Sequence, residues 1–232
     1  MNTGKRQSRV IISATCFADA DGAIAMATIL AQKLNSDVYG LLVEDEAILQ
    51  YANQPVANAV AFQSGIRQQV TPEAMAFAFR SDARIFKAIL AKAAREASIN
   101  WSFESKRGRL MPLLHSLSSK GDMVLLGYQR TPMISDEIIF LNYGNSGDSN
   151  FLELANQIAQ ESKVPFQAIS SGKMQASERD NATINHSEDQ VLELLHSKSL
   201  RAVFVAVSAE QDFDADKILE AARCPIIYLV QS

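Results

Sequence analysis

The sequence predicts an α/β protein built from two related halves, each containing a parallel β-sheet. Three observations point to this fold class. Apolar runs such as Val10–Ile12 and Met123–Leu126 are continuous, which is typical of parallel strands covered on both faces. Segments whose apolar residues recur every three or four positions separate these runs and predict helices. Short sequences from the first half of the chain also recur in the second half.

In the first half, the predicted elements alternate between strands and helices. Asp19 and Asp21 precede the first helical pattern, which ends near Asn35. Thr71-Pro72-Glu73 starts a long helix, because a hydroxyl can cap the first turn and Pro is favoured at the first helical position. The predicted strands are 10–12, 38–43, 100–104 and 123–126, and the predicted helices are 24–35, 47–52, 71–98 and 110–118.

The second half follows the same order with fewer residues. Asp214 is the predicted N-cap of its last helix, and the polar stretch 170–187 is predicted to be a surface loop. The predicted strands are 138–141, 164–169, 202–207 and 226–230, and the predicted helices are 151–158, 191–197 and 214–222. Each half is incomplete: the first lacks a closing helix and strand, and the second lacks the middle section.

Two short matches support an internal duplication. Ala31-Gln32 matches Ala159-Gln160, and each pair lies near the end of a helix that is followed by a strand. Residues 113–116 and 194–197 both read Leu-Leu-His-Ser ahead of an apolar strand. Because four identical residues can arise by chance, the order of elements carries more weight than the tetrapeptide.

The predicted domains are residues 1–135, with a long helical insert, and the shortened residues 136–232. They differ in charge: the first has 15 Lys and Arg against 11 Asp and Glu, and the second has 7 against 15. Opposite charges favour docking of the halves on each other and give no general attraction for nucleic acid. We therefore expect a pseudo-dimer of the two halves or a homodimer. A basic helix face could instead dock the acidic half or an acidic protein partner; it comprises Arg80, Arg84, Lys87 and Arg95.

The two cysteines, Cys16 and Cys224, are far apart and neither belongs to a Cys-x-x-Cys pair. This spacing argues against a disulfide framework and against a zinc site. No apolar run approaches the ~20 residues that span a bilayer, and no secretory signal follows Lys5 and Arg6. The expectation is a cytoplasmic protein that does not bind membranes.

The closing segment of the chain resembles a known family. Residues 218–230 read Ile-Leu-Glu-Ala-Ala-Arg-Cys-Pro-Ile-Ile-Tyr-Leu-Val, similar to the last helix and strand of universal stress proteins. Residues 9–34 are similar to that family's first strand and helix, and residues 122–127 to the strand that ends in its first nucleotide-site glycine. The resemblance implies an adenine nucleotide alpha hydrolase-like fold with strand order 3-2-1-4-5 in each half. It also implies ligand contacts at the carboxyl ends of strands, for which Thr15, Val43 and Gly127 are the candidates.

The sequence departs from the ATP-binding members of that family. They carry an Asp at the end of the first strand, where this chain has Ser13-Ala14-Thr15 in the first half and Asn142-Tyr143 in the second, and a glycine signature after the fourth strand. Here only Gly127 is present in the first half. Four acidic residues follow the corresponding strand of the second half: Glu210, Asp212, Asp214 and Asp216. Since acids repel phosphate, we expect no ATP binding in the family manner and no cofactor.

The loop 144–149, which connects a predicted strand to a helix N-terminus, is a second candidate site. Backbone amides at such a position can bind an anion. The loop also faintly resembles the Ser-Gly-Gly-x-Asp-Ser loop of ATP pyrophosphatases, although it lacks one glycine and has a different spacing. A turn followed by an N-cap explains the same residues. The candidate ligand contacts are Gly144, Ser146, Gly147, Asp148 and Ser149.

Other conspicuous residues favour structural roles. His115 and His196 occupy matching positions without metal-ligand partners at suitable spacing, so we expect partly buried structural histidines. Trp101 and Phe103 are predicted on opposite faces of one strand, within the core. The sequence has no Gly-x-Ser-x-Gly, His-Glu-x-x-His or Walker motif, and nothing positive supports catalysis.

The favoured hypothesis is therefore a stress-response or regulatory protein that binds a small ligand or a partner protein. One alternative is a nucleotide-binding enzyme that uses the loop 144–149. Another is a purely structural pseudo-dimer, in which duplication replaces the pairing of two separate chains. The fold cannot choose among these functions, because function depends on sites that differ between proteins of one fold.

Overall fold

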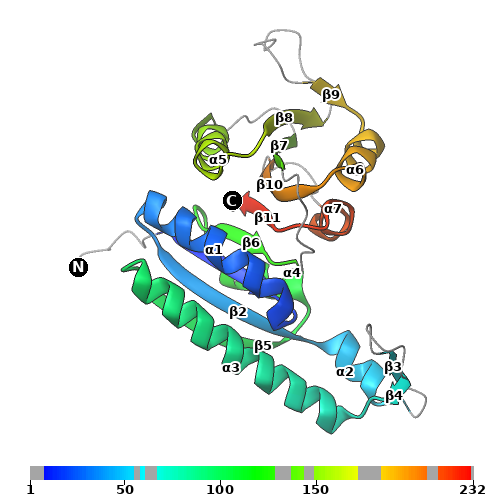
Figure 1. Cartoon of the computed structure of the whole chain (residues 1–232). Helices are drawn as coiled ribbons and strands as arrows, with labels where there is room; N and C mark the ends of the chain where they lie inside the picture. Colours follow the sequence, from blue (N-terminus) through cyan, green and yellow to red (C-terminus); the bar gives the residue numbers. More distant parts are fainter. Residues whose placement is uncertain are drawn as a thin grey trace.

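The computed structural model describes residues 8–54, 58–60, 67–128, 137–143, 149–171, 184–207 and 214–230. These residues form a nine-stranded sheet with helices on both faces, together with a separate two-stranded hairpin (Figure 1). The strand order is β5-β2-β1-β6-β11-β10-β7-β8-β9, and β6–β11 is its one antiparallel pair. The predicted α/β class with mostly parallel strands is confirmed.

The elements before residue 130 follow the predicted order and add a short hairpin. They are β1 (Arg9–Ala14), α1 (Phe17–Leu34), β2 (Asp37–Asp45), α2 (Glu46–Ala52), β3 (Asn58–Val60), β4 (Arg67–Gln69), α3 (Pro72–Glu96), β5 (Trp101–Gly108), α4 (Leu110–Leu117) and β6 (Met123–Leu126).

The elements after residue 136 contain one strand that the sequence did not predict. They are β7 (Glu137–Tyr143), α5 (Ser149–Ser162), β8 (Phe166–Ser171), β9 (Ile184–His186), α6 (Glu188–Ser197), β10 (Leu200–Val207), α7 (Ala215–Ala222) and β11 (Ile226–Leu229). The predicted loop 170–187 is therefore wrong at both ends, where β8 and β9 pair in parallel. Its central part, 172–183, lies outside the described residues.

The capping residues explain which helix starts could be predicted. Thr71 and Asp214 cap α3 and α7, accepting hydrogen bonds from the amides of Ala74 and Lys217, both at 3.2 Å. The predicted start of α1 is wrong, because the helix begins at Phe17 and Asp19 lies in its first turn. Its N-cap, Cys16, makes no side-chain cap bond, so the sequence carries no capping signal there.

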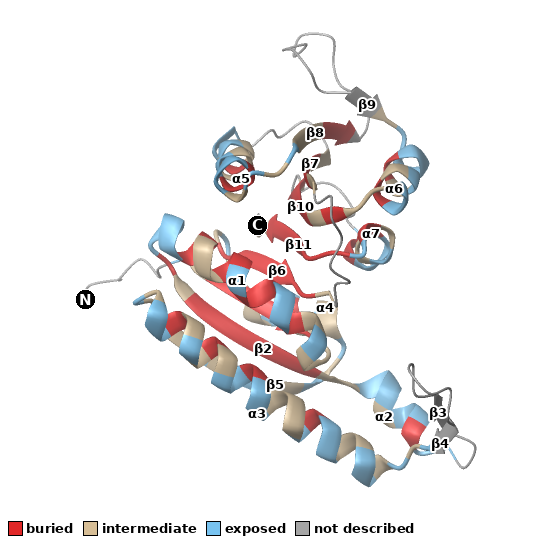
Figure 2. Ribbon diagram, viewed as in Figure 1, coloured by how far each residue is buried: buried red, intermediate tan, exposed pale blue. Residues whose placement is uncertain are grey.

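Two apolar layers hold the helices on the sheet. One layer contains buried residues of α1, α3 and α5, and the other contains those of α4, α6 and α7. Figure 2 shows the buried residues concentrated along the central strands. Trp101 and Phe103 both pack in the layer of α1 and α3. The prediction that they face opposite ways is wrong, because residues two apart in a strand point to the same side.

The pairing of β6 with β11 joins the strands before residue 130 to those after residue 136. Met123 pairs with Leu229 at one end and Leu126 with Ile226 at the other. Two further bonds extend the pairing, from the Gly121 amide to the Val230 carbonyl (3.0 Å) and from the Val230 amide to the Asp122 carbonyl (2.9 Å). The two sheets expected from the sequence are thus one continuous sheet.

An ion pair between buried Asp122 and partly buried Arg9 lies at the start of β1 and β6, beside this pairing. The Arg9 guanidinium donates to the Asp122 carboxylate at 2.7 Å and to the Leu117 carbonyl at 2.9 Å. The same carboxylate accepts the amides of Arg9 and Ser119, both at 3.0 Å. Arg9 also lies 5.2 Å from the centre of the Tyr39 ring. Asp122 therefore connects β1, β6 and the preceding turn through its side chain, and β11 through its carbonyl.

The strand order agrees in part with the order that the resemblance implies. We number the main-sheet strands of each part by their order in the chain. The part before residue 130 then reads 3-2-1-4 from its edge strand β5, and the part after residue 136 reads 3-2-1-4-5 from its edge strand β9. At the edge of β6, where a fifth strand of the first half would pair, the structure has β11. The predicted domain boundary near residue 135 lies outside the described residues and remains a prediction.

The matched sequences have matched structural roles. Ala31 and Ala159 are both buried and accept a backbone amide just past the helix end. The hydroxyls of Ser116 and Ser197 donate to the carbonyl three residues earlier, at 2.8 and 2.9 Å. These parallels support an internal duplication, which stays a prediction. The expectation for the two histidines of the tetrapeptides is wrong, because both side chains are exposed to solvent.

The predicted basic face lies on α3. Among the described elements, α3 packs mainly against α1, α2, β2 and β5, so its charged residues do not join the two halves. The joining contacts come instead from strand pairing. No helix in the described part of the chain is long and apolar enough to cross a membrane.

Replacing Asp122 with Ala should lower the free energy of unfolding by about 1.5–3 kcal/mol, because it removes the charge partner of Arg9 and leaves the amides of Arg9 and Ser119 without their acceptor. Urea denaturation measures this change. The matched control is Glu96→Ala, which removes an exposed ion pair with Lys92 and should cost less than about 0.5 kcal/mol. Equal effects of the two variants would contradict the structural role assigned to Asp122.

Candidate functional site

The antiparallel pairing of β6 and β11 places two carboxyl edges at opposite ends of the sheet. One edge is formed by the ends of β1, β2, β5 and β6, and the other by the ends of β7 to β11. Ligands of open parallel sheets bind beyond the carboxyl ends of strands, where the strand order reverses. Each edge is therefore a candidate site.

At the first edge, the protein's own carboxylates occupy the start of α1. The Asp19 carboxylate accepts hydrogen bonds from the Thr15 hydroxyl at 3.3 Å and the Cys16 thiol at 3.1 Å. The Asp82 carboxylate, from α3, accepts the backbone amide of Phe17 at 3.1 Å. The amide that a helix N-terminus could offer to an anionic ligand is thus already bonded to an acid.

The chemistry of Cys16 reflects this environment. Partial burial, followed by the hydrogen bond to Asp19, raises the pKa of the Cys16 thiol to about 11. The charges of Asp19 and Asp82 act in the same direction. A neutral, hydrogen-bonded thiol is a poor nucleophile, so this cysteine is not activated for catalysis.

The other predicted contacts at this edge are closely packed. Gly127 donates its amide to the Ser13 carbonyl at 2.8 Å, and a Cβ added to it would lie 2.5 Å from the Asp19 carbonyl oxygen. The Val43 side chain is fully buried in the apolar layer of α4. Thr15 and Gly127 thus meet at the first turn of α1, while Val43 faces the opposite layer. Ligand contact by these three residues stays a prediction.

The second edge differs because it contains buried polar atoms without partners. Among the described residues, the atoms include Asn142 Oδ1, Ser170 Oγ and His186 Nε2, at the ends of β7, β8 and β9. Ser170 is only 3% exposed. At the first edge, Ser13 Oγ is unpaired in the same way, but alone. Unpaired buried polar atoms are rare in folded proteins, and three on adjacent strands make this edge the stronger candidate.

Strand register brings two of these side chains together. Asn142 pairs with Ser170 on one side and with Ala206 of β10 on the other. Paired residues of a parallel sheet point to the same face, which here is the face that carries α5. His186 pairs with Ser171 and therefore faces the opposite side of the sheet.

The loop predicted to bind an anion connects β7 to α5 at this same edge. Ser149 is the first residue of α5, and its side chain is exposed. Gly144, Ser146, Gly147 and Asp148 lie outside the described residues, so contacts by this loop remain predictions. The edge nevertheless combines a helix N-terminus with the unpaired atoms of Asn142 and Ser170.

The start of α7, after β10, is acidic. Burial and the neighbouring charges of Asp214 and Glu220 raise the pKa of the Asp216 carboxyl. Burial is the larger cause of this shift, and the two neighbouring carboxylates add to it. Within the described ranges, no cluster of three or more His, Cys, Asp or Glu side chains could hold a metal ion.

Sequence reasoning missed Asn142 and Ser170 as site residues. A polar residue at the end of an otherwise apolar strand is a weak signal, because such residues usually bond to the following loop. Only the three-dimensional structure distinguishes these two atoms, which have no partner, from Thr15, which has one.

Comparisons with known proteins identify the fold. No family model matches the sequence, and a search of curated proteins finds no match. A universal stress protein from Archaeoglobus fulgidus is 8% identical with a TM-score of 0.51, over 95% of each chain. A Pseudomonas aeruginosa protein assigned as a universal stress protein is 12% identical with a TM-score of 0.50, over 97% of this chain and 93% of that chain. A functionally unknown Pseudomonas aeruginosa protein is 11% identical with a TM-score of 0.51, over 97% and 92%. The predicted resemblance is confirmed for the fold.

Two glycines at the first edge provide a matched test of its packing. Gly127→Ala should lower the free energy of unfolding by about 1–3 kcal/mol, because the new methyl group would overlap the Asp19 carbonyl. Gly22→Ala, on the exposed side of α1, should raise it by up to about 1 kcal/mol, since Ala favours a helix. Chemical denaturation measures both. An unchanged stability in Gly127→Ala would show that the edge is more open than the structure indicates.

Alkylation measures the environment of Cys16. With a pKa of about 11, about 0.1% of the thiol is ionised at pH 8, so iodoacetamide should react at least tenfold more slowly than with the unfolded chain. The rate should rise with pH until about pH 11. Asp19→Asn should accelerate the reaction, because it removes the neighbouring negative charge. Peptide mapping separates Cys16 from Cys224, which is fully buried. A fast reaction at pH 8 in the unmodified chain would contradict this environment.

Proposed function

We propose that this chain is a non-catalytic, stress-response or regulatory binding protein whose ligand is a small, uncharged polar molecule. The site lies at the carboxyl ends of β7 and β8. The unpaired atoms Asn142 Oδ1 and Ser170 Oγ carry the proposal. A ligand that donates a hydrogen bond to them would provide the partners that the described part of the protein lacks.

The side-chain oxygens of Asn142 and Ser170 are buried at an energetic cost. A buried polar atom without a partner costs about 1–3 kcal/mol, and a ligand that bonds it recovers this cost on binding. Neither atom is needed for strand pairing, since β7 and β8 are joined through their backbones. Polar side chains at these positions therefore contribute more to a bound state than to the folded chain alone.

Charge favours an uncharged ligand over ATP. At the first edge, Asp19 and Asp82 lie where phosphates would meet the start of α1. At the second edge, repulsion among Asp214, Asp216 and Glu220 would act against a triphosphate. The absence of ATP binding in the family manner remains part of this proposal. It rests on these charges and on the missing glycine signature.

A nucleotide-binding enzyme is the competing function, and it would use the same edge. In that case the amides at the start of α5 would bind phosphate beside Asn142 and Ser170. The two functions differ in the charge of the preferred ligand. The solved structures named as universal stress proteins support the regulatory role only by similarity of fold.

Ligand-dependent thermal denaturation tests the proposal. Adenosine, AMP and Mg-ATP form a series of rising negative charge, to be measured alongside neutral sugars and amides. A neutral compound at one hundred times its Kd should stabilise the chain by about 2.7 kcal/mol, and Mg-ATP should give no shift. A shift that grows from adenosine to Mg-ATP would favour the enzyme, and no shift with any neutral compound would contradict the proposal.

Serine-to-alanine variants locate the site, because they are expected to keep the chain folded. Ser170→Ala should leave the stability of the free chain unchanged or slightly raised, because its hydroxyl has no partner to lose, and should reduce the ligand-induced shift. The matched control is Ser36→Ala, which removes a bond to the Leu34 carbonyl at 3.3 Å. This variant should lose up to about 1 kcal/mol of stability and keep the full ligand-induced shift. A full shift in Ser170→Ala would place the ligand elsewhere.

A further inference from the structure

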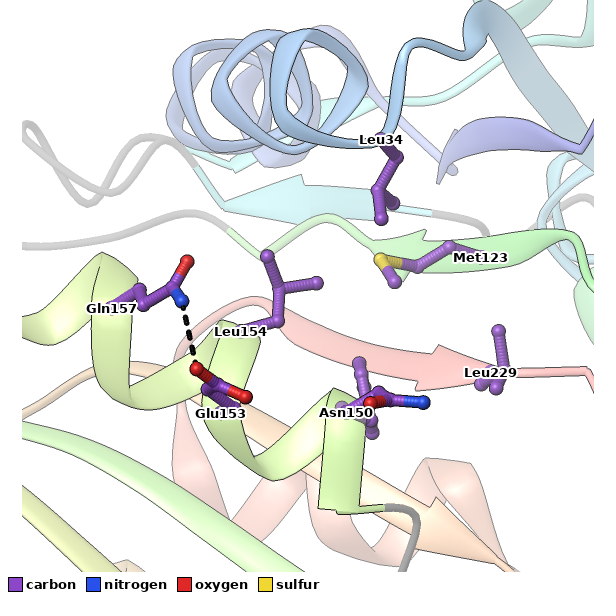
Figure 3. A pocket seen from close by; sticks show the side chains of 8 residues that line it. Leu34, Met123, Asn150, Glu153, Leu154, Gln157 and Leu229 are labelled. Carbon is purple, nitrogen blue, oxygen red and sulfur yellow. Dashed lines mark hydrogen bonds between the residues drawn. The ribbon is translucent and has the colours of Figure 1, made fainter.

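A separate pocket of about 330 Å³ lies where β6 meets β11, between α1 and α5. Residues of α1, β6, α5 and β11 line it: Leu34, Met123, Asn150, Phe151, Glu153, Leu154, Gln157 and Leu229. Leu229 ends β11 and Asn150 lies at the start of α5, but the pocket is lined by neither Asn142 nor Ser170, the residues that carry the proposed site at β7 and β8. Figure 3 shows Leu34 reaching from α1 towards the strands and Leu154 projecting from α5 into the same space.

The pocket follows from the antiparallel pairing. Met123 and Leu229 are paired residues of β6 and β11, and both point to the face that carries α1 and α5. Each of these helices packs on the strands of its own part of the sheet. The helices therefore leave the Met123–Leu229 pair between them, and this pair lines the pocket with Leu34 and Leu154.

The walls of the pocket are held in place by core packing. The ring of Phe151 packs against Phe140 and Phe204, with ring centres 5.7 and 5.6 Å apart. An ion pair between Lys33 and Glu161, at 2.6 Å, links α1 to α5. A largely preformed, mainly apolar pocket of this volume is at the lower limit for small-molecule sites. Its occupant is therefore a compound of about ten non-hydrogen atoms.

The polar groups of the pocket determine the charge of its ligand. Among the described residues that line the pocket, Glu153 is the one with an ionisable side chain, and its carboxylate accepts a bond from the Gln157 amide at 3.3 Å. The nearest described cation of α1, Lys33, is bonded to Glu161. A ligand with an amine would face an acceptor, and a ligand with a carboxylate would be repelled.

From this geometry we propose that the pocket binds a small apolar molecule that carries a single cationic amine. The apolar part contacts Met123, Leu154 and Leu229, and the amine lies beside Glu153. Because the ligand touches both parts of the sheet, its binding stabilises the contact between them. This site does not depend on the proposed function at β7 and β8, and either can fail without the other.

Three probes with the same ring test the proposal: 2-phenylethylamine, 2-phenylethanol and 3-phenylpropionate. Methyl-labelled methionine provides an NMR signal from Met123. The amine should shift this signal saturably, with a Kd on the order of 1 mM for so small a ligand. At low ionic strength it should bind about two- to fivefold more tightly than the carboxylate, as expected for an exposed charge pair.

Matched variants separate the pocket from the rest of the surface. Leu34→Trp should fill the pocket and abolish the shift of Met123, whereas Ile85→Trp, at a similarly exposed position on α3, should not. Glu153→Gln should remove the preference for the amine, and Glu193→Gln on α6 should preserve it. Leu154→Phe serves as a second filling variant, and circular dichroism verifies the fold of each protein.

The expected result is a saturable Met123 shift, favoured by the amine and lost in both filling variants. The proposal is overturned if none of the three probes gives a saturable shift. It is also overturned if the shift persists in folded Leu34→Trp and Leu154→Phe, or if the carboxylate binds as well as the amine.

Discussion

Backbone hydrogen bonds between β6 and β11 join two sets of parallel strands into one sheet, and the positions of both candidate edges depend on them. The antiparallel direction places the carboxyl ends of the two sets at opposite ends of the sheet. It also leaves the pocket between α1 and α5 that Met123 and Leu229 line. Asp122 reinforces the pairing, because its side chain holds Arg9 at the start of β1 while its carbonyl accepts the amide of Val230.

The two carboxyl edges differ in how their polar side chains are satisfied. At the first, Asp82 accepts the Phe17 amide, Asp19 accepts the Thr15 hydroxyl and the Cys16 thiol, and Gly127 lets the chain after β6 approach α1 closely. At the second, Asn142 and Ser170 are buried without partners. The first edge is thus stabilised by its own residues, and the second retains groups that a ligand could bond. This asymmetry is the physical basis for proposing a single carboxyl-edge site in a sheet that has two such edges.

The sequence predicted elements whose signals are local. The strand 123–126 agrees with the structure because its apolar run is continuous, and α3 starts as predicted because Thr71 and Pro72 are strong start signals. The strand β9 was missed because three residues become a strand only by pairing with β8. The pairing of β6 with β11 joins segments about one hundred residues apart and leaves no local pattern. Asn142 and Ser170 were missed for a related reason, since the absence of a partner depends on neighbours from other strands.

Native-state hydrogen exchange of the amides shared by β6 and β11 tests most directly whether this pairing holds the sheet together. Reference amides lie within each part: Gly127, bonded to Ser13 at 2.8 Å, and Val203, bonded to Pro225 at 3.0 Å. If the pairing unites the sheet, the shared amides should exchange with the same free energy as these references, through global unfolding. Exchange of the shared amides at a free energy several kcal/mol lower, with Gly127 and Val203 still protected, would show that the two parts separate while each stays folded. That result would contradict the account.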